Sequence, residues 1–212
     1  MSKVTKLSDA ELFTLGAGVA SILGAGWTCS EDFDRETGRS WGVIVTDSGS
    51  ASFRMARDWR EKGKLNISGR YPKGGADFDM GVDYGHNVKR YNESLPAIQV
   101  SASRPAKAIA GEVQRRFLPE YLPFLARAIE ARDSAVRCHA ARDDASASLI
   151  AASGGMLRKN HNDQNAHIHT DGFFGDARIS HDGQEVELHF RSLPRAVAEM
   201  MLRTLAESMA QA

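Results

Sequence analysis

The fold is indicated first by one stretch near the C-terminus, Arg178-Ile-Ser-His-Asp-Gly-Gln-Glu-Val-Glu-Leu-His-Phe190. Apolar and polar residues alternate in it on both sides of Asp182-Gly183, and this period of two is typical of β-strands with one buried face. Asp-Gly is also a preferred dipeptide of type I′ turns. The stretch therefore predicts a β-hairpin, to which a third strand with His167 and His169 can be added.

The N-terminal half carries the same alternation in several segments. Strands are predicted at residues 41–45, 53–56, 64–71 and 97–101, and they indicate an antiparallel meander with one solvated face. An amphipathic helix precedes them at residues 7–23, with Ser8 as N-cap and Glu11 at the third position of a capping box. The meander is thus expected to pack under helices.

A second helix is expected to begin at Ser103-Arg-Pro105, with Ser103 as its N-cap. Pro119 and Pro123 are expected to break or kink it, since proline removes a hydrogen bond inside a helix. Residues 124–152 then form a long helical segment. Residues 71–95 are rich in Gly, Asp and Asn and predict a long loop, either functional or an insertion.

Together these elements predict an α+β protein of two antiparallel-sheet-plus-helix units. Ser192-Leu-Pro194 matches Ser103-Arg-Pro105, which indicates an imperfect β-β-β-α repeat, with an N-terminal helix and a long central helical segment added. The alternative is that Ser and Pro are simply common at strand-to-helix junctions. The expected domains are residues 1–153 and 165–212, with a linker at 154–164.

Composition excludes several classes of protein. The 212 residues include 27 Lys or Arg and 27 Asp or Glu, so net charge offers no global attraction to nucleic acid. No apolar run is long enough to span a membrane, and the N-terminus lacks the apolar core of a signal peptide. Cys29 and Cys138 are too far apart for a thiolate metal motif. We therefore expect a cytoplasmic protein without a membrane partner.

The C-terminal sheet offers the first candidate site. If Asp182-Gly183 sets the register, His189 shares a face with Arg178 and Glu187, and His167 and His169 join them if their strand pairs alongside. Histidines at i and i+2 on a strand suit a zinc ion or another divalent metal. The spacing matches no specific metal motif, so a cofactor-free protein with surface histidines, or a polar contact with a partner, stays open.

The solvated face of the N-terminal sheet offers the second candidate site. Its cations could hold phosphates, with Trp59 and Tyr71 available for stacking on bases, although Tyr71 falls in the inward phase of its strand. A charged outer face is also the ordinary condition of a solvated sheet. The residues predicted to bind nucleic acid or a partner are Arg54, Arg57, Arg60, Lys62, Lys64, Asn66, Arg70 and Gln99, together with Arg178 and Arg191 of the second sheet.

Signatures of catalysis are missing from the sequence. It has no phosphate-binding loop, no nucleophile elbow and no HExxH, and Cys138 and His139 are adjacent in a helix, where neighbours do not face each other. These absences favour a non-enzymatic protein. A hydrolase or transferase with scattered catalytic residues stays open.

Three runs carry a resemblance: Leu65-Asn-Ile-Ser-Gly-Arg-Tyr-Pro72, Ile98-Gln-Val-Ser-Ala-Ser-Arg-Pro-Ala-Lys-Ala-Ile-Ala110 and Arg115-Arg-Phe-Leu-Pro-Glu-Tyr-Leu122. Over about residues 7–130 the chain resembles uncharacterised accessory proteins encoded by bacteriophages and other bacterial mobile elements. The resemblance implies a genomic setting rather than a chemistry. Small proteins of such elements often bind DNA, or bind and block a host defence complex, as anti-CRISPR proteins do.

The function that follows is a non-enzymatic binding protein acting on a host protein or nucleoprotein complex. The alternatives are a nucleic-acid-binding protein that uses the basic sheet face, and a His-dependent metalloprotein. A host-protein target would be expected to contact residues 72–95 or the exposed side of helix 124–152. A homodimer is also compatible with the sequence.

Overall fold

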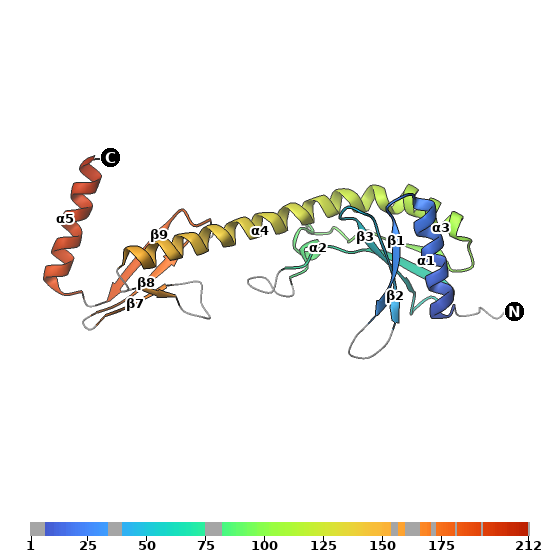
Figure 1. Ribbon diagram of the computed structural model, residues 1–212, viewed down its shortest axis with the longest axis horizontal. Helices are drawn as coiled ribbons and strands as arrows, with labels where there is room; N and C mark the ends of the chain where they lie inside the picture. The colour runs from blue at the N-terminus through green and yellow to red at the C-terminus, as the bar shows by residue number, and fades with distance from the viewer. Residues whose placement is uncertain are drawn as a thin grey trace. The chain divides into compact units, whose positions relative to one another are not determined.

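The computed structural model describes residues 7–33, 40–74, 82–153, 157–159, 166–170, 173–180, 182–191 and 193–211. It is an α+β protein and divides into two compact units, unit 1 (Met1–Asp133) and unit 2 (Ser134–Ala212). The division falls inside α4 (Leu118–Ala152), the helix at whose end the sequence predicts a domain boundary. Figure 1 shows the elements in chain order.

Unit 1 is built on a five-stranded antiparallel meander. The order β1-β2-β3-β4-β5 follows the sequence. Its strands are β1 (Thr28–Phe33), β2 (Ser40–Thr46), β3 (Ser52–Arg57), β4 (Lys64–Gly69) and β5 (Ala97–Ser101). Inward residues such as Val45, Phe53 and Ile67 are fully buried, which is the alternation that the sequence predicts.

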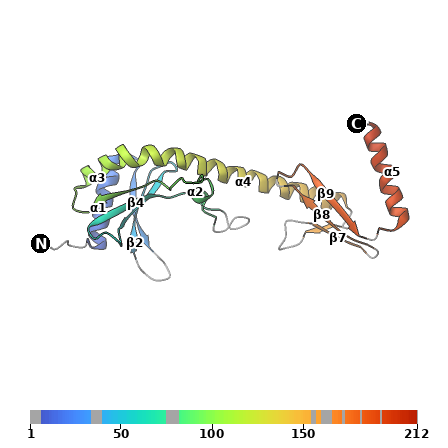
Figure 2. The ribbon, with the colours of Figure 1, turned by 180° about the vertical axis from the view of Figure 1, so that it is seen from behind.

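Helices cover the inward face of this sheet (Figures 1 and 2). The predicted capping box is present at the start of α1 (Asp9–Leu23), where Ser8 and Glu11 bond each other's backbone N–H groups. Gly16 of α1 meets β2 so closely that an added Cβ would lie 2.7 Å from Val43 Cγ2. A small residue is therefore required where this helix crosses the sheet.

A second helical run supplies the rest of the core. It consists of α3 (Ala106–Glu112), a π-helical turn η1 (Val113–Phe117) and α4. The Phe117 ring stacks on Tyr121 at 5.0 Å and meets Phe53 edge-on at 5.5 Å. These rings join the helices to the sheet.

Tyr121 also ties two strands together through its hydroxyl group. That oxygen accepts a hydrogen bond from Ser52 N–H (3.1 Å) and lies within donating distance of the carbonyl oxygens of Ser52 (2.7 Å) and Arg70 (2.8 Å). Burial raises the pKa of Tyr121 to about 12. A Cβ on Gly69 would lie 2.4 Å from the Tyr121 ring, so glycine is needed at the end of β4.

The structure differs from the local predictions at four places in this unit. The N-cap of α3 is Pro105, without a side-chain cap, because the Ser103 hydroxyl bonds Ser101 Oγ instead (2.9 Å). The break expected at Pro119 and Pro123 is absent, because α4 continues through both prolines to Ala152. β1 has no counterpart among the strands predicted from the sequence. The predicted loop of residues 71–95 contains a short helix, α2 (Tyr84–Asn87), with Tyr84 buried.

Unit 2 holds a four-stranded meander in the order β6-β7-β8-β9. Its strands are β6 (Leu157–Lys159), which lies in the predicted linker, β7 (Ala166–Thr170), β8 (Phe173–Ile179) and β9 (Val186–Arg191). Ala177 is buried against Leu149 and Ile150 of α4 and against Phe190. The chain continues into α5 (Arg195–Gln211).

The hairpin of β8 and β9 has the predicted register but not the predicted turn. Arg178 pairs with Glu187, while Ser180 N–H donates to the Glu185 carbonyl at 2.8 Å, so the loop has four residues. Gly183 has a φ of +74°, and Asp182 is not in the left-handed region that a type I′ turn requires of both central residues. A Cβ on Gly183 would lie 2.7 Å from the Ala141 carbonyl oxygen of α4, which explains the glycine.

Candidate nucleic-acid interface

The solvated face of the unit 1 sheet brings several predicted site residues together. Arg54 pairs with Ser68 across β3 and β4, and Asn66 pairs with Gln99 across β4 and β5, so these residues share the face opposite the core. Lys64 pairs with Ser101 at the end of the same strands. The face is therefore polar, as the alternation predicts.

Its charge is nevertheless compensated. Asp32 of β1 lies between two of the predicted cations, with Arg54 Nε at 2.8 Å and Arg70 Nη1 at 3.8 Å from its carboxylate oxygens. Lys64 pairs with Glu61, and Gln99 Nε2 donates to Asp58 at 2.6 Å. The middle of the sheet is thus a mixed polar surface with little net positive charge.

Arg57 does not join this surface. It is the last residue of β3 rather than part of the connecting loop, and its guanidinium donates to the Leu7 carbonyl oxygen (2.6 Å) and to Asp9 at the start of α1. Residues 57 and 54 differ by an odd number, so they lie on opposite faces of the strand. Arg57 secures the N-terminal helix to the sheet.

A net positive charge is found instead where the β3–β4 turn lies beside the β5–α3 connection. The β3–β4 turn contacts the β5–α3 connection, since Ala102 N–H donates to the Gly63 carbonyl at 2.8 Å. Residues 58–64 and 101–116 together carry seven Lys or Arg and three Asp or Glu, in a chain whose formal net charge is zero. We call this surface the cationic end of unit 1; its residues are Trp59, Arg60, Lys62, Lys64, Arg104, Lys107, Arg115 and Arg116.

Three of these arginines surround one carboxylate. Glu112, whose side chain is only 15% exposed, accepts from Arg115 (2.8 Å), Arg116 (3.1 Å) and Arg104 (3.4 Å). The hydrogen bond from Arg116, aided by Arg115, holds the pKa of Glu112 below its ordinary value. One negative charge thus orients three cations, which remain at least half exposed and are positioned to receive anions.

The β3–β4 turn presents an exposed aromatic ring beside Arg60. Trp59 is 83% exposed, and the Arg60 guanidinium carbon lies 4.5 Å from its ring centroid. Asp58 holds the turn by accepting from the N–H groups of Arg60 (2.8 Å) and Glu61 (3.1 Å). An exposed indole next to guanidinium groups can stack on an unpaired base while the cations contact phosphates. Tyr71, the other predicted stacking residue, packs in the core against Tyr121.

The cationic end was only partly predictable. Arg60, Lys62 and Lys64 are among the predicted binding residues, whereas Arg104, Lys107, Arg115 and Arg116 are additions from the structure. The spacing of Glu112 with Arg115 and Arg116, three and four residues apart in a predicted helix, could have identified part of the cluster. Its closeness to the β3–β4 turn depends on the pairing of β4 with β5.

The histidine face of unit 2 is aligned by register. His167 pairs with Asp176 and Asp176 pairs with His189, so the three form one cross-strand row, and His169 pairs with Phe174. His189 Nε2 lies 2.9 Å from Glu187, and Arg178 Nε lies 3.5 Å from Asp176. The side chains of His167 and His169 lie outside the described part of the structure. Among the side chains that are described, no three His, Cys, Asp or Glu converge as metal ligands.

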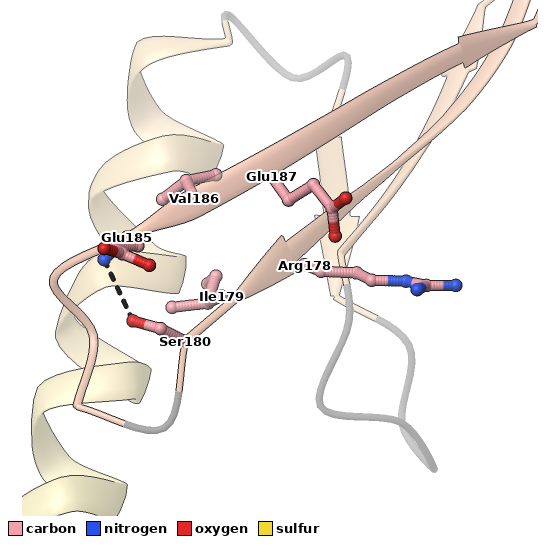
Figure 3. Close-up of a pocket in the computed structure, with 6 residues that line it drawn as sticks. All are labelled: Arg178, Ile179, Ser180, Glu185, Val186 and Glu187. Carbon is pink, nitrogen blue, oxygen red and sulfur yellow. Dashed lines mark hydrogen bonds between the residues drawn. The ribbon is translucent and has the colours of Figure 1, made fainter.

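A hollow of about 660 Å³ lies at the β8–β9 end of this sheet. Figure 3 shows its lining, with Glu185 N–H donating to Ser180 Oγ at 2.9 Å. Arg178 and Glu187, which are paired in register, extend from one side of the hairpin. Arg191 is exposed near the end of β9. Charges of both signs line the hollow, so it does not favour an anion or a cation.

None of the helices in the described part of the chain combines the length and apolar character needed to cross a membrane. Comparisons with protein-family models, with curated protein sequences and with solved structures find no match. The functional argument therefore rests on the surfaces described above.

Proposed function

We propose that the chain is a non-enzymatic binding protein that contacts nucleic acid through the cationic end of unit 1. The observation that carries this proposal is the collection of seven cations against three acids in two contacting segments of a neutral chain, with an exposed tryptophan on one of them. The contact of Ala102 with Gly63 brings the cations of the β3–β4 turn near the start of the helical run that carries Lys107, Arg115 and Arg116. For an accessory protein of a bacteriophage or mobile element, the target would be nucleic acid or a nucleoprotein complex.

Single-stranded nucleic acid suits this surface best. Phosphates would lie against Lys62, Lys107 and the arginines around Glu112, while Trp59 would stack on an unpaired base. A base within a duplex has both faces covered by its neighbours and cannot offer such stacking. We therefore expect a labelled single strand to bind more tightly than the corresponding duplex at equal salt.

The first test is charge reversal at two exposed lysines. Lys62→Glu/Lys107→Glu should weaken binding of a fluorescein-labelled 20-nucleotide single strand, followed by anisotropy, by at least about tenfold, because phosphate contacts become repulsions. The matched control is Lys73→Glu/Lys89→Glu, which makes the same change in net charge near α2, at the opposite end of unit 1 from α3 (Figures 1 and 2). Equal losses in both variants would contradict a specific surface.

The second test addresses the tryptophan. Trp59→Ala should weaken binding about tenfold, since base–aromatic stacking contributes roughly 1–3 kcal/mol. Trp59→Phe keeps an aromatic ring and should retain most of the affinity. A Trp59→Ala variant that binds like the parent chain would show that the ring does not contact the strand.

A further inference from the structure

The last helix of the chain carries an apolar stripe whose C-terminal half is not covered by the described residues of unit 2. In α5 the apolar residues recur at spacings of three and four, so they lie along one side of the helix. Leu202, Leu205 and Met209 are 66%, 56% and 80% exposed. We call this side the α5 stripe; its residues are Val197, Ala198, Met201, Leu202, Leu205 and Met209.

A second apolar surface lies on the strand that precedes the helix. Val186 and Leu188 share the face of β9 that carries Phe190, the residue packed against Ala177, yet they are 39% and 46% exposed. The helix beneath the sheet therefore covers only part of this face. The described residues of unit 2 thus leave two apolar surfaces partly exposed, one on β9 and one on α5, and three residues, 192–194, separate these elements.

We propose that a second copy of this chain covers these surfaces, with the α5 stripes of the two copies packed against each other and flanked by the β9 residues. A second copy is favoured by comparing the length of the α5 stripe with the length of the exposed apolar part of β9. The stripe extends over about 18 Å of helix, at 1.5 Å per residue, whereas Val186 and Leu188 extend over about 7 Å of strand. The chain's own β9 can cover only part of the stripe, while an identical helix matches it fully and forms a self-complementary two-fold contact.

The exposed apolar area of unit 2 and the charges on the polar side of α5 both support a second copy as the partner. The exposed parts of Leu202, Leu205, Met209, Val186 and Leu188 amount to roughly 500 Å² per copy, or about 1,000 Å² in a dimer, the lower limit for a specific interface. The polar side of α5 alternates in sign, with Arg195 and Glu199 paired at 2.7 Å and followed by Arg203 and Glu207. A side without net charge does not suit nucleic acid or an anionic lipid surface.

The test is the mass of the full-length chain in solution, measured by light scattering after size exclusion between 5 and about 200 μM, the range in which an interface of this size associates. The unmodified chain should reach twice the monomer mass as concentration rises. Leu202→Glu/Leu205→Glu should remain monomeric throughout, because two charges would be buried in the contact. Ala196→Glu/Met200→Glu places two charges at exposed positions on the polar side of α5 and should dimerise like the parent.

Charge complementation makes the result specific to the stripe. Leu202→Arg/Leu205→Arg should also be monomeric alone, but a mixture with the Glu variant should form heterodimers, since opposite charges then meet. A monomeric parent chain at the highest concentration, a dimer that survives both stripe variants, or a stripe that binds vesicles of phosphatidylcholine and phosphatidylglycerol instead would each overturn the proposal. Circular dichroism should show unchanged helix content, because the substituted side chains are exposed.

Discussion

In both units a helix follows the last strand of a sheet, but this helix is buried in the core of unit 1 and largely exposed in unit 2. In unit 1, α3 follows β5 and buries Ile109 and Ala110 completely in the core. In unit 2, α5 follows β9 and leaves Leu202, Leu205 and Met209 of its apolar stripe exposed. Both helices start directly after a proline, Pro105 or Pro194, so the junctions are alike and the packing is not.

This difference indicates where stability and interaction reside. Unit 1 has a core of aliphatic and aromatic side chains shared by the sheet and two helical runs, and it has the surface that we assign to nucleic acid. In unit 2 the described core centres on Ala177. A thin core with a free apolar helix is expected of a unit that is completed by association.

The largest expected effect contrasts two phenylalanines. Phe117→Ala in unit 1 should lower the free energy of unfolding by about 3–5 kcal/mol, because a fully buried ring is lost between Phe53 and Tyr121. Phe190→Ala in unit 2 should cost less than half as much, since Phe190 is only partly buried. Urea unfolding followed by tryptophan fluorescence and circular dichroism measures both. Equal losses would contradict the contrast between the units.

A smaller effect is expected from a methyl group at the end of β4. Gly69→Ala should destabilise unit 1 by about 1–3 kcal/mol, because the added Cβ meets the Tyr121 ring at 2.4 Å. Gly111→Ala is the control, since its Cβ would meet nothing within 4 Å and alanine favours a helix. The control should raise the thermal midpoint while Gly69→Ala lowers it. A neutral Gly69→Ala would show that the ring is not held against β4.

The smallest effect compares two tyrosines that contact each other. Tyr121→Phe should cost about 1–2 kcal/mol, because the Ser52 N–H group loses its acceptor. Among the described residues the buried Tyr71 hydroxyl has no hydrogen-bond partner, so Tyr71→Phe should change stability by less than about 0.5 kcal/mol or increase it. Similar losses in both variants would contradict this assignment.

The pH dependence of stability provides a second test of the burial of the Tyr121 hydroxyl. Its pKa is raised from 10 to about 12 in the folded chain, so between these values the folded state retains a proton that the unfolded state has lost. The free energy of unfolding should therefore fall as pH rises from 10 to 12. Tyr121→Phe should show a shallower decline, which repeated urea titrations at pH 9.5 and 11 would measure.

Much of the fold was readable from the sequence because the relevant signals are local. The α1 capping box depends on residues three apart, and the alternation in β3, β4 and β5 depends on burial of one face. β1 was missed because Thr28-Cys-Ser-Glu-Asp-Phe33 is a mostly exposed edge strand without a regular apolar period. Pro123 was misinterpreted because tertiary packing outweighs the local cost of a proline in a helix.

The candidate site depends on contacts that the sequence does not display. The neutralisation of Arg54 and Arg70 requires Asp32 from a strand that was not predicted. The joining of the β3–β4 turn to the β5–α3 connection follows from strand pairing over some forty residues of intervening chain. The sequence therefore shows which residues are cationic, but only the fold shows which of them form ion pairs with nearby carboxylates.

The central claim is that the cationic end of unit 1 holds the phosphates of nucleic acid. It is tested most directly by the salt dependence of single-strand binding by the full-length chain between 50 and about 300 mM NaCl, a range over which counterion release is strong. With about four phosphates neutralised, the plot of log K against log salt should have a slope near −3, and Lys62→Glu/Lys107→Glu should reduce its magnitude by about one or more. No measurable binding at 50 mM, or a flat slope shared by the parent and the variant, would contradict the assignment.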